Sequence, residues 1–203
     1  MAKVGVIGAG SWGTALSVLL ADNGHQVTIW SIDENEVKML DEKREHLMKL
    51  PGVKLSDSMK ITGDLKAAVT GKDFLVLAVP SPFTRATAKK MSAYVVKGQI
   101  IVDVAKGIEE STLLTLSSQI EEEIPQADVA VLSGPSHAEE VSIAIPTALV
   151  IASKHQNILK MVQDAFMSEK MRIYTSNDVK GVELGGALKN IIAFCSGAAA
   201  GIG

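Results

Sequence analysis

Several features that would assign a protein class at once are scarce in this 203-residue chain. Its single cysteine, Cys195, excludes an internal disulfide and fits a reducing compartment. No uninterrupted apolar run reaches the roughly 18 residues that a membrane-spanning helix needs. The net charge is only −3, which gives no basic surplus for a nucleic-acid partner. Internal repeats and clusters with metal-ligand spacing are lacking, and no signal segment precedes the first strand-like run. We therefore expect a cytoplasmic protein without a metal site, a membrane or a nucleic acid among its partners.

A glycine-rich turn near the N-terminus is the most informative feature that is present. Residues 4–7 form a short apolar run that is typical of a buried parallel strand. Gly8, Gly10 and Gly13 follow in the spacing G-x-G-x-x-G, and apolar residues then recur at the spacing of one helix face. A second strand pattern comes next and ends near Asp33, which lies 20 residues beyond Gly13.

This order of elements predicts a cradle for a dinucleotide. Gly8 permits a tight turn, Gly10 lets the backbone approach a pyrophosphate, and Gly13 lets the helix pack closely on the strand. The N-terminus of the helix directs unpaired N–H groups and a positive dipole end at the pyrophosphate. A carboxylate at Asp33 accepts hydrogen bonds from the 2′-OH of the adenine ribose. The alternative is a glycine turn that binds no ligand.

The rest of the chain alternates between strand and helix patterns, which predicts a Rossmann-type, doubly wound α/β fold with a mostly parallel sheet. Helices are expected over residues 34–48, from Ser81 as N-cap, over residues 109–123 with Leu113 facing inward, and over 178 to about 200. We expect a dinucleotide-binding domain over 1–178. Residues 179–203 are expected to be the first helix of a truncated, all-helical substrate domain, because the chain ends in an apolar helix pattern.

Ligands in such sheets lie at the carboxyl ends of the strands, so we examined the residues expected there. Lys106 follows an apolar strand pattern and either holds an anionic or carbonyl oxygen beside a nicotinamide or is a solvated loop lysine. Ser136 and Glu139 have the spacing of a capping box, so a helix is expected to begin there. Its N-terminus is either a second anion site, which would include Gly134, or only a capped helix start.

Lys189 is the most distinctive single residue, because it interrupts the apolar stretch 182–194. Partial burial would lower the pKa of its ammonium group and make it a usable proton donor near neutral pH. The alternative is a lysine on a helix edge whose stem is buried and whose charge stays in water. Asn190, its neighbour, is placed to orient a substrate oxygen.

Four segments resemble, in order along the whole chain, bacterial NAD(P)-dependent glycerol-3-phosphate dehydrogenase: GAGSWGTAL, VAKGIE, LSGPSHAEEV and GVELGGALKNIIA. The last segment is specific, whereas the first is shared by many dehydrogenases. The resemblance implies an oxidoreductase that interconverts dihydroxyacetone phosphate and sn-glycerol 3-phosphate by hydride transfer with NAD(P)H. It also implies a role in supplying glycerophospholipid biosynthesis.

The resemblance also implies roles for individual residues. Those implied at the cofactor are Ser11, Trp12, Lys106 and Ala138. Those implied at the substrate are Lys106, Gly134, Ser136 and Lys189. Lys189 is implied as the catalytic proton acceptor, or as the donor in the reductive direction, and Lys106 helps it to stabilise the developing alkoxide.

The chain departs from the family pattern in two respects. Members that favour NADPH often carry a basic residue after the second strand, where this chain has Ser31, Ile32 and Asp33. We therefore expect NAD to be preferred, with NADP possible. Family members also continue into a helical domain that completes the phosphate site and forms most of a homodimer. The 203-residue chain is accordingly expected to bind the cofactor but to turn over poorly.

Two other functions remain open at this point. One is another dehydrogenase of the same architecture, acting on a hydroxyacid or a phosphogluconate-type substrate. The other is a non-catalytic dinucleotide-binding module that senses redox state, for which Lys106 and Lys189 would be dispensable. The sequence around Lys189 and Asn190 favours the glycerol-3-phosphate dehydrogenase interpretation over both.

Overall fold

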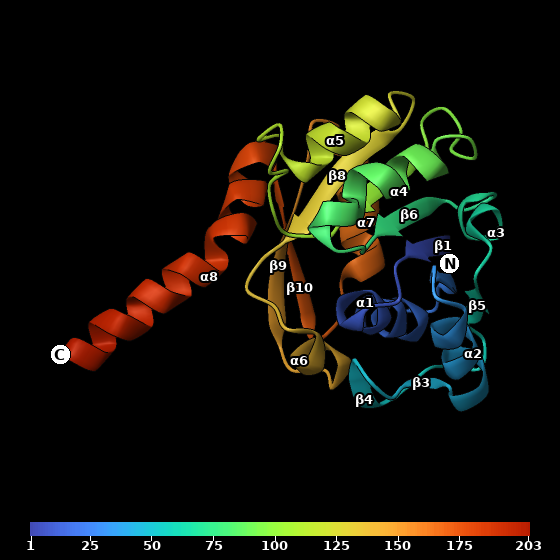
Figure 1. Cartoon of the computed structure of the whole chain (residues 1–203), viewed down its shortest axis with the longest axis horizontal. Coiled ribbons are helices and arrows are strands. Elements are labelled where there is room, and N and C mark those ends of the chain that lie inside the picture. The colour runs from blue at the N-terminus through green and yellow to red at the C-terminus, as the bar shows by residue number, and fades with distance from the viewer.

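The computed structural model describes all residues from 1 to 203. Its fold is organised around an eight-stranded sheet. The strand order is β10-β9-β8-β7-β6-β1-β2-β5, and every neighbouring pair is parallel except β8 with β9. The strands are β1 (Lys3–Ile7), β2 (Gln26–Trp30), β5 (Lys60–Thr62), β6 (Phe74–Leu77), β7 (Ile100–Asp103), β8 (Asp128–Ser133), β9 (Thr147–Ser153) and β10 (Met171–Ser176). This arrangement (Figure 1) confirms the predicted Rossmann-type α/β fold.

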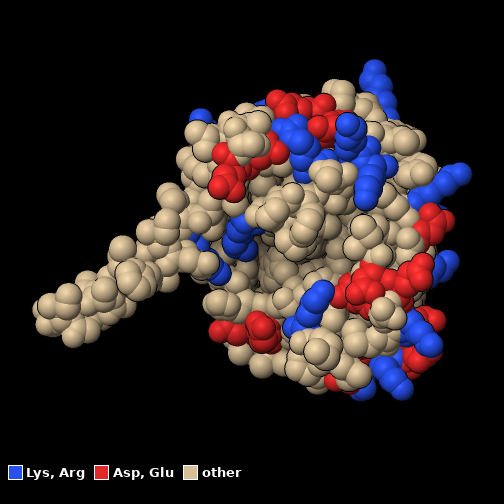
Figure 2. All heavy atoms as spheres, viewed as in Figure 1, with Lys and Arg blue, Asp and Glu red and all other residues tan.

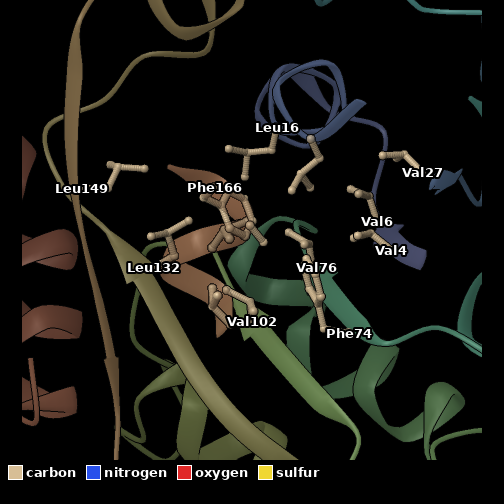
Figure 3. Packing of buried hydrophobic residues seen from close by; sticks show 14 of the residues in the cluster. Val4, Val6, Leu16, Val27, Phe74, Val76, Val102, Leu132, Leu149 and Phe166 are labelled. Carbon is tan, nitrogen blue, oxygen red and sulfur yellow. The ribbon is translucent and has the colours of Figure 1, made fainter. Parts of the chain in front are cut away.

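Helices cover both faces of the sheet (Figure 1). The helices are α1 (Ser11–Asp22), α2 (Glu34–Lys43), α3 (Leu65–Val69), α4 (Thr84–Met91), α5 (Leu116–Glu123), α6 (Ala138–Ser142), α7 (Gln156–Phe166) and α8 (Val179–Ile202). Alternate residues of each central strand point to opposite faces, so both faces need apolar side chains. Phe74 and Val76 belong to the core that includes α1 and α7, where the ring of Phe74 lies 6.2 Å from that of Phe166 (Figure 3). Leu75 and Leu77 belong to the core under α3, α4 and α5.

The sheet order locates the crevice in which a ligand is expected. β1 lies between β2 and β6, so the chain returns to the other side of β1 after β5. Open α/β sheets bind ligands at such a reversal, outside the carboxyl ends of the strands. The segments that follow β1, β6, β7 and β8 therefore meet at one edge of the sheet.

The predicted helix over 34–48 is too long. α2 ends at Lys43, and Arg44 adopts a left-handed conformation with φ of 49°. A short antiparallel hairpin follows, formed by β3 (Glu45–His46) and β4 (Leu50–Lys54). Its Leu50 and Val53 are buried against α1 and α6, and this packing between distant segments overrides the local helix pattern.

The predicted helix over 109–123 is also too long, because α5 begins only at Leu116. The segment before it is a loop closed by a β-bridge between Ile108 and Thr115. Leu113, which was expected to face inward, is 78% exposed and has a φ of 60°. Arg85 of α4 holds Glu109 through two hydrogen bonds of 2.7 and 2.8 Å, and this contact between distant residues fixes the loop.

The start of the helix after β6 also differs from the expectation. A 3-10 turn over Ser81–Phe83 precedes α4, and Ser81 is the first residue of this turn and not its cap. The position before this turn is occupied by Pro80. Ser81 is therefore not the N-cap of a long helix, and the segment instead lines the cavity described below.

Helix α8 projects from the body as an arm (Figure 1), and beyond Lys189 it carries no charged residue, as the uniformly tan arm in Figure 2 shows. Ile191, Ile192 and Phe194 are each about 60% exposed or more. By length and composition α8 would reach across a membrane, and its most apolar stretch is not buried against the body, but one helix of this kind is weak evidence. The expectation that no segment is long and apolar enough to span a membrane considered only uninterrupted apolar runs, and α8 contains polar residues among its apolar ones.

Candidate active site

The glycine turn has the geometry that its spacing predicted. Gly10 is the N-cap residue of α1, which begins at Ser11. A Cβ atom on Gly8, whose φ is 118°, would lie 2.7 Å from the carbonyl oxygen of Ala78. A Cβ atom on Gly13 would lie 2.0 Å from the carbonyl oxygen of Gly8. A Cβ atom on Gly10 would meet no protein atom within 4 Å, so the backbone is open to a ligand at this residue alone of the three.

Two cavities adjoin this turn, and both are lined by Gly10 and by residues 78–80 after β6. The larger has a volume of about 590 Å³ and is lined by Ser11, Trp12 and Lys106 together with the Ser136–Glu139 segment. The smaller has a volume of about 330 Å³ and lies beside the end of β2. The molecular surface on the face in Figure 2 is visibly hollowed near its centre.

The two lysines that were predicted from separate segments lie near each other, with Lys106 at the larger cavity and Lys189 at a third cavity described below. The ammonium nitrogen of Lys106 lies 5.4 Å from the centre of the Trp12 ring, within the range of a cation–π contact. Lys189 is half-buried, and its Nζ donates to the carbonyl oxygen of Ser136 at 3.3 Å. Burial lowers the pKa of Lys106, and the charge of Lys189 lowers it further, against the opposing effect of Asp103.

Helix α8 reaches this position because Gly186 has no side chain. A Cβ atom there would lie 2.4 Å from Oγ of Ser133 and 3.5 Å from Cγ of Lys106. One turn earlier, the buried carboxylate of Glu183 accepts hydrogen bonds from the backbone N–H of Ser117 at 2.8 Å and from its hydroxyl at 2.7 Å. The close approach at Gly186 and the hydrogen bonds of Glu183 therefore fix the position of α8, and with it the position of Lys189.

Several buried polar atoms around Lys106 lack a hydrogen-bond partner within the protein. They are Trp12 Nε1, Asp103 Oδ2, Ser133 Oγ and Ser136 Oγ. Buried polar groups are normally paired, so the unpaired atoms of Trp12 and Ser136 at the larger cavity fit a site that binds a polar ligand. The open backbone at Gly10 and this set of donors and acceptors together fit a dinucleotide and a small polar substrate.

The predicted capping box is wrong. α6 begins at Ala138, with His137 as its N-cap and no capping hydrogen bond from a side chain. The Ser136 hydroxyl is buried at the larger cavity instead, and Ala138 lines the same cavity. Gly134 lies at a third cavity, of about 340 Å³, which Lys189 also lines. A five-residue helix is too short to serve as a separate anion site.

Asp33 and Asn190, two other residues predicted at the site, line none of these three cavities. Asp33 is exposed and caps α2, with its Oδ1 accepting from the backbone N–H groups of Asn35 and Glu36. It is not among the residues that line the smaller cavity, and Glu36 and Lys49 line it instead. Asn190 is exposed and lines neither the larger cavity nor the one beside Gly134.

Asp103 and Glu183 were not singled out from the sequence. Asp103 ends an apolar strand and Glu183 lies in an apolar helix pattern, so in both cases an isolated acid in a buried run was the available signal. Asp103 is fully buried, and its Oδ1 accepts from the backbone N–H of Ala105 at 3.2 Å. Burial raises the pKa of Asp103 to about 8, and the charge of Glu183 adds to this effect.

The raised pKa of Asp103 leads to a prediction about stability. Between pH 4 and 8 the folded protein retains a proton on Asp103 that the unfolded chain releases, so the free energy of unfolding falls as the pH rises. Asp103→Asn keeps the neutral form, and its stability should decline less over this range. The difference should be on the order of a few kcal/mol, at about 1.4 kcal/mol per pKa unit. Urea unfolding of both proteins at pH 5 and pH 8 measures it, and equal declines would contradict the assignment.

The fold and the glycine turn together define a Rossmann-type dinucleotide-binding protein. The family described as NAD-dependent glycerol-3-phosphate dehydrogenase N-terminus has a model that matches residues 3–159. The chain belongs to this family, whose members are NAD(P)-dependent enzymes with an NAD-binding N-terminal domain.

Individual relatives agree with this assignment. The chain is 60% identical over its whole length to the glycerol-3-phosphate dehydrogenase [NAD(P)+] of Agathobacter rectalis and 49% identical to that of Fusobacterium nucleatum. The crystal structure of glycerol-3-phosphate dehydrogenase from Coxiella burnetii superposes with a TM-score of 0.90 at 32% identity, over 95% of this chain and 59% of that one. The chain spans about 60% of the length of the curated relatives that it matches.

Proposed function

We propose that this chain is the cofactor-binding part of a glycerol-3-phosphate dehydrogenase, which interconverts dihydroxyacetone phosphate and sn-glycerol 3-phosphate in the cytoplasm and supplies glycerophospholipid biosynthesis. The observation that carries the proposal is the convergence of Lys106 and Lys189 beside the glycine turn, with Gly186 packed against the stem of Lys106. A module that only senses redox state has no need of Lys106 at the wall of the larger cavity or of Lys189 beside Ser136 of the same wall.

The cofactor would occupy both cavities. The N-terminus of α1 at Ser11 would hold the pyrophosphate, since its backbone N–H groups are free of intrahelical partners. Ile32 and Phe83 line the smaller cavity and are 72% and 60% exposed, which suits them to flank the adenine ring. Trp12 and Ala138 would lie beside the nicotinamide in the larger cavity.

The two lysines would perform the polar part of the reaction. When bound, the reduced nicotinamide supplies the hydride that adds to the carbonyl carbon of dihydroxyacetone phosphate. Lys106, held over the Trp12 ring, stabilises the negative charge that develops on the carbonyl oxygen. Lys189 donates a proton from Nζ to that oxygen and takes it back in the oxidative direction. Ser136 lines the larger cavity with Lys106, Gly134 lines the third cavity with Lys189, and both residues would contact the substrate.

The proposal extends to the cofactor, the domains and the assembly. A carboxylate near the end of β2 favours NAD(H) over NADP(H), as first argued for Asp33. Residues 1–178 form the dinucleotide-binding domain, and 179–203 begin the substrate domain, which fits the projection of α8 (Figure 1). The relatives are longer, so we propose that the additional part completes the phosphate site and forms a homodimer.

Titration calorimetry of the 203-residue chain with NADH, followed by an assay of dihydroxyacetone phosphate reduction, tests this function. We expect NADH to bind and turnover to remain below about 1% of that of the same chain extended by the C-terminal part of the Agathobacter rectalis relative. A profile of hydroxyacid and phosphogluconate substrates on the extended protein distinguishes the other dehydrogenases. Full activity of the 203-residue chain, or a different preferred substrate, would overturn the proposal.

A further inference from the structure

A second acidic residue on α2, Glu36, is more enclosed than Asp33. The side chain of Glu36 is only 10% exposed. Its Oε1 accepts from Nε2 of His46 at 2.8 Å and from Nζ of Lys49 at 2.6 Å, and its Oε2 accepts from the hydroxyl of Ser31. The β3–β4 hairpin brings His46 and Lys49 to α2, so this hairpin and Ser31 at the end of β2 together hold the carboxylate of Glu36 in place.

This carboxylate lies where the adenine ribose of a bound dinucleotide is expected. Glu36, Ser31 and Ile32 line the smaller cavity at the carboxyl end of β2, and the same cavity continues to Gly10. The pyrophosphate at the glycine turn and the adenine beside Ile32 leave the ribose between them. Asp33 caps α2 with its Oδ1 and is not among the residues lining this cavity.

The hydrogen-bond arrangement leaves Glu36 charged and able to accept one more bond. Burial raises the pKa of Glu36, but the hydrogen bonds from Lys49, Ser31 and His46 outweigh burial, and the pKa lies below its usual value. Two carboxylate oxygens offer about four acceptor positions, of which three are used here. The remaining position suits the 2′-OH of an unphosphorylated ribose.

We propose that Glu36, rather than Asp33, selects NADH against NADPH by accepting from the ribose 2′-OH and repelling a 2′-phosphate. This inference rests on the proposed function, because it assumes that a dinucleotide occupies the smaller cavity. Lys49 and Lys90 also line the cavity and would attract a 2′-phosphate. Lys49 is already paired with Glu36, however, so its charge is offset where the ribose lies.

Calorimetric titration of NADH and NADPH into the 203-residue chain and two variants tests the proposal. The wild type should bind NADH more tightly than NADPH. Glu36→Gln keeps the size of the side chain and removes its charge, and it should raise the affinity for NADPH relative to NADH about tenfold, which corresponds to about 1.4 kcal/mol. Asp33→Asn is the matched control, because asparagine also caps helices, and it should change the ratio less than about twofold.

A salt series on the wild type gives a second measurement that does not depend on folding of a variant. If Glu36 repels the 2′-phosphate, raising NaCl from about 20 mM to about 500 mM should narrow the preference for NADH, because salt screens the repulsion. If Lys49 and Lys90 attract it instead, the affinity for NADPH should fall more steeply than that for NADH, and Glu36 is not the selector.

The outcomes separate this inference from the proposed function. Binding of neither cofactor would refute the dinucleotide function, and the inference with it. If both cofactors bind but Glu36→Gln leaves the ratio of NADH to NADPH affinity unchanged, the role of Glu36 is refuted and the proposed function stands. The same holds if Asp33→Asn shifts this ratio as much as Glu36→Gln does. A wild type that prefers NADPH would do the same.

Discussion

Replacing Gly10 with valine is expected to abolish NADH binding and to leave the fold stable. A Cβ atom at this residue meets no protein atom within 4 Å, and Gly10 lines both cavities beside the glycine turn. The added side chain would occupy the path along which the backbone approaches the pyrophosphate. We expect at least a hundredfold weaker binding, or about 2.7 kcal/mol, by titration calorimetry. The melting temperature should change little, because Gly10 precedes the first residue of α1.

Gly13→Ala is the matched control, with the opposite expected result. Its Cβ atom would lie 2.0 Å from the carbonyl oxygen of Gly8, so the strand and α1 must separate. We expect the free energy of unfolding to fall by about 1–3 kcal/mol, as is typical of overpacking in a core. Normal NADH binding by the Gly10→Val protein would show that the turn is not the pyrophosphate site.

Alanine at Lys189 is expected to have the largest effect on turnover. The measurement uses the chain extended by the C-terminal part of the Agathobacter rectalis relative, since the relatives are longer than this chain. Loss of a proton donor typically lowers kcat by about 10²–10⁴-fold. NADH affinity should stay within a few fold, because Lys189 lines the cavity beside Gly134 and not the larger one. Arginine should not restore kcat, because a guanidinium group keeps its proton near neutral pH.

The alanine variant of Lys106 should differ from that of Lys189 in that it loses cofactor affinity as well as turnover. Lys106 contacts the Trp12 ring at the larger cavity, so its loss should weaken the binding of both NADH and substrate and lower kcat as well. Lys180→Ala, in the first turn of α8, is the control for a lysine on the same helix and should retain full activity. Retained turnover in both site variants would favour a module that binds the dinucleotide without catalysis.

The sequence predicted the sheet well because each central strand carries its own signal. Runs such as Phe74–Leu77 are apolar on both faces, and helices alternate with them, so the fold class follows from local patterns. The joint role of Lys106 and Lys189 was instead implied by the resemblance to a known family, because no strand pattern by itself brings Lys189 to the sheet edge where Lys106 lies. The loop around Leu113 was not, because it depends on the contact of Glu109 with Arg85 of another helix.

The residues at the adenosine end were missed for a similar reason. Glu36 looks in the sequence like one acid among several on a charged helix. Its enclosure comes from His46 and Lys49, which belong to a hairpin whose Leu50 and Val53 pack against α1. Asp33 was favoured as the ribose-binding acid because its spacing from Gly13 can be read along the chain. The enclosure of Glu36 depends instead on how the end of β2, α2 and the β3–β4 hairpin lie in space.

The continuity of α8 has a mechanical consequence. The helix runs without a break from Val179 to Ile202, and its fixed points against the body, Glu183 and Gly186, both lie before Lys189. Lys189 therefore lies directly after the part of α8 that contacts the body, and the longer remainder of the helix projects away from the body. We therefore expect that a domain or subunit packing against the distal turns of α8 also influences the position of the Lys189 ammonium group.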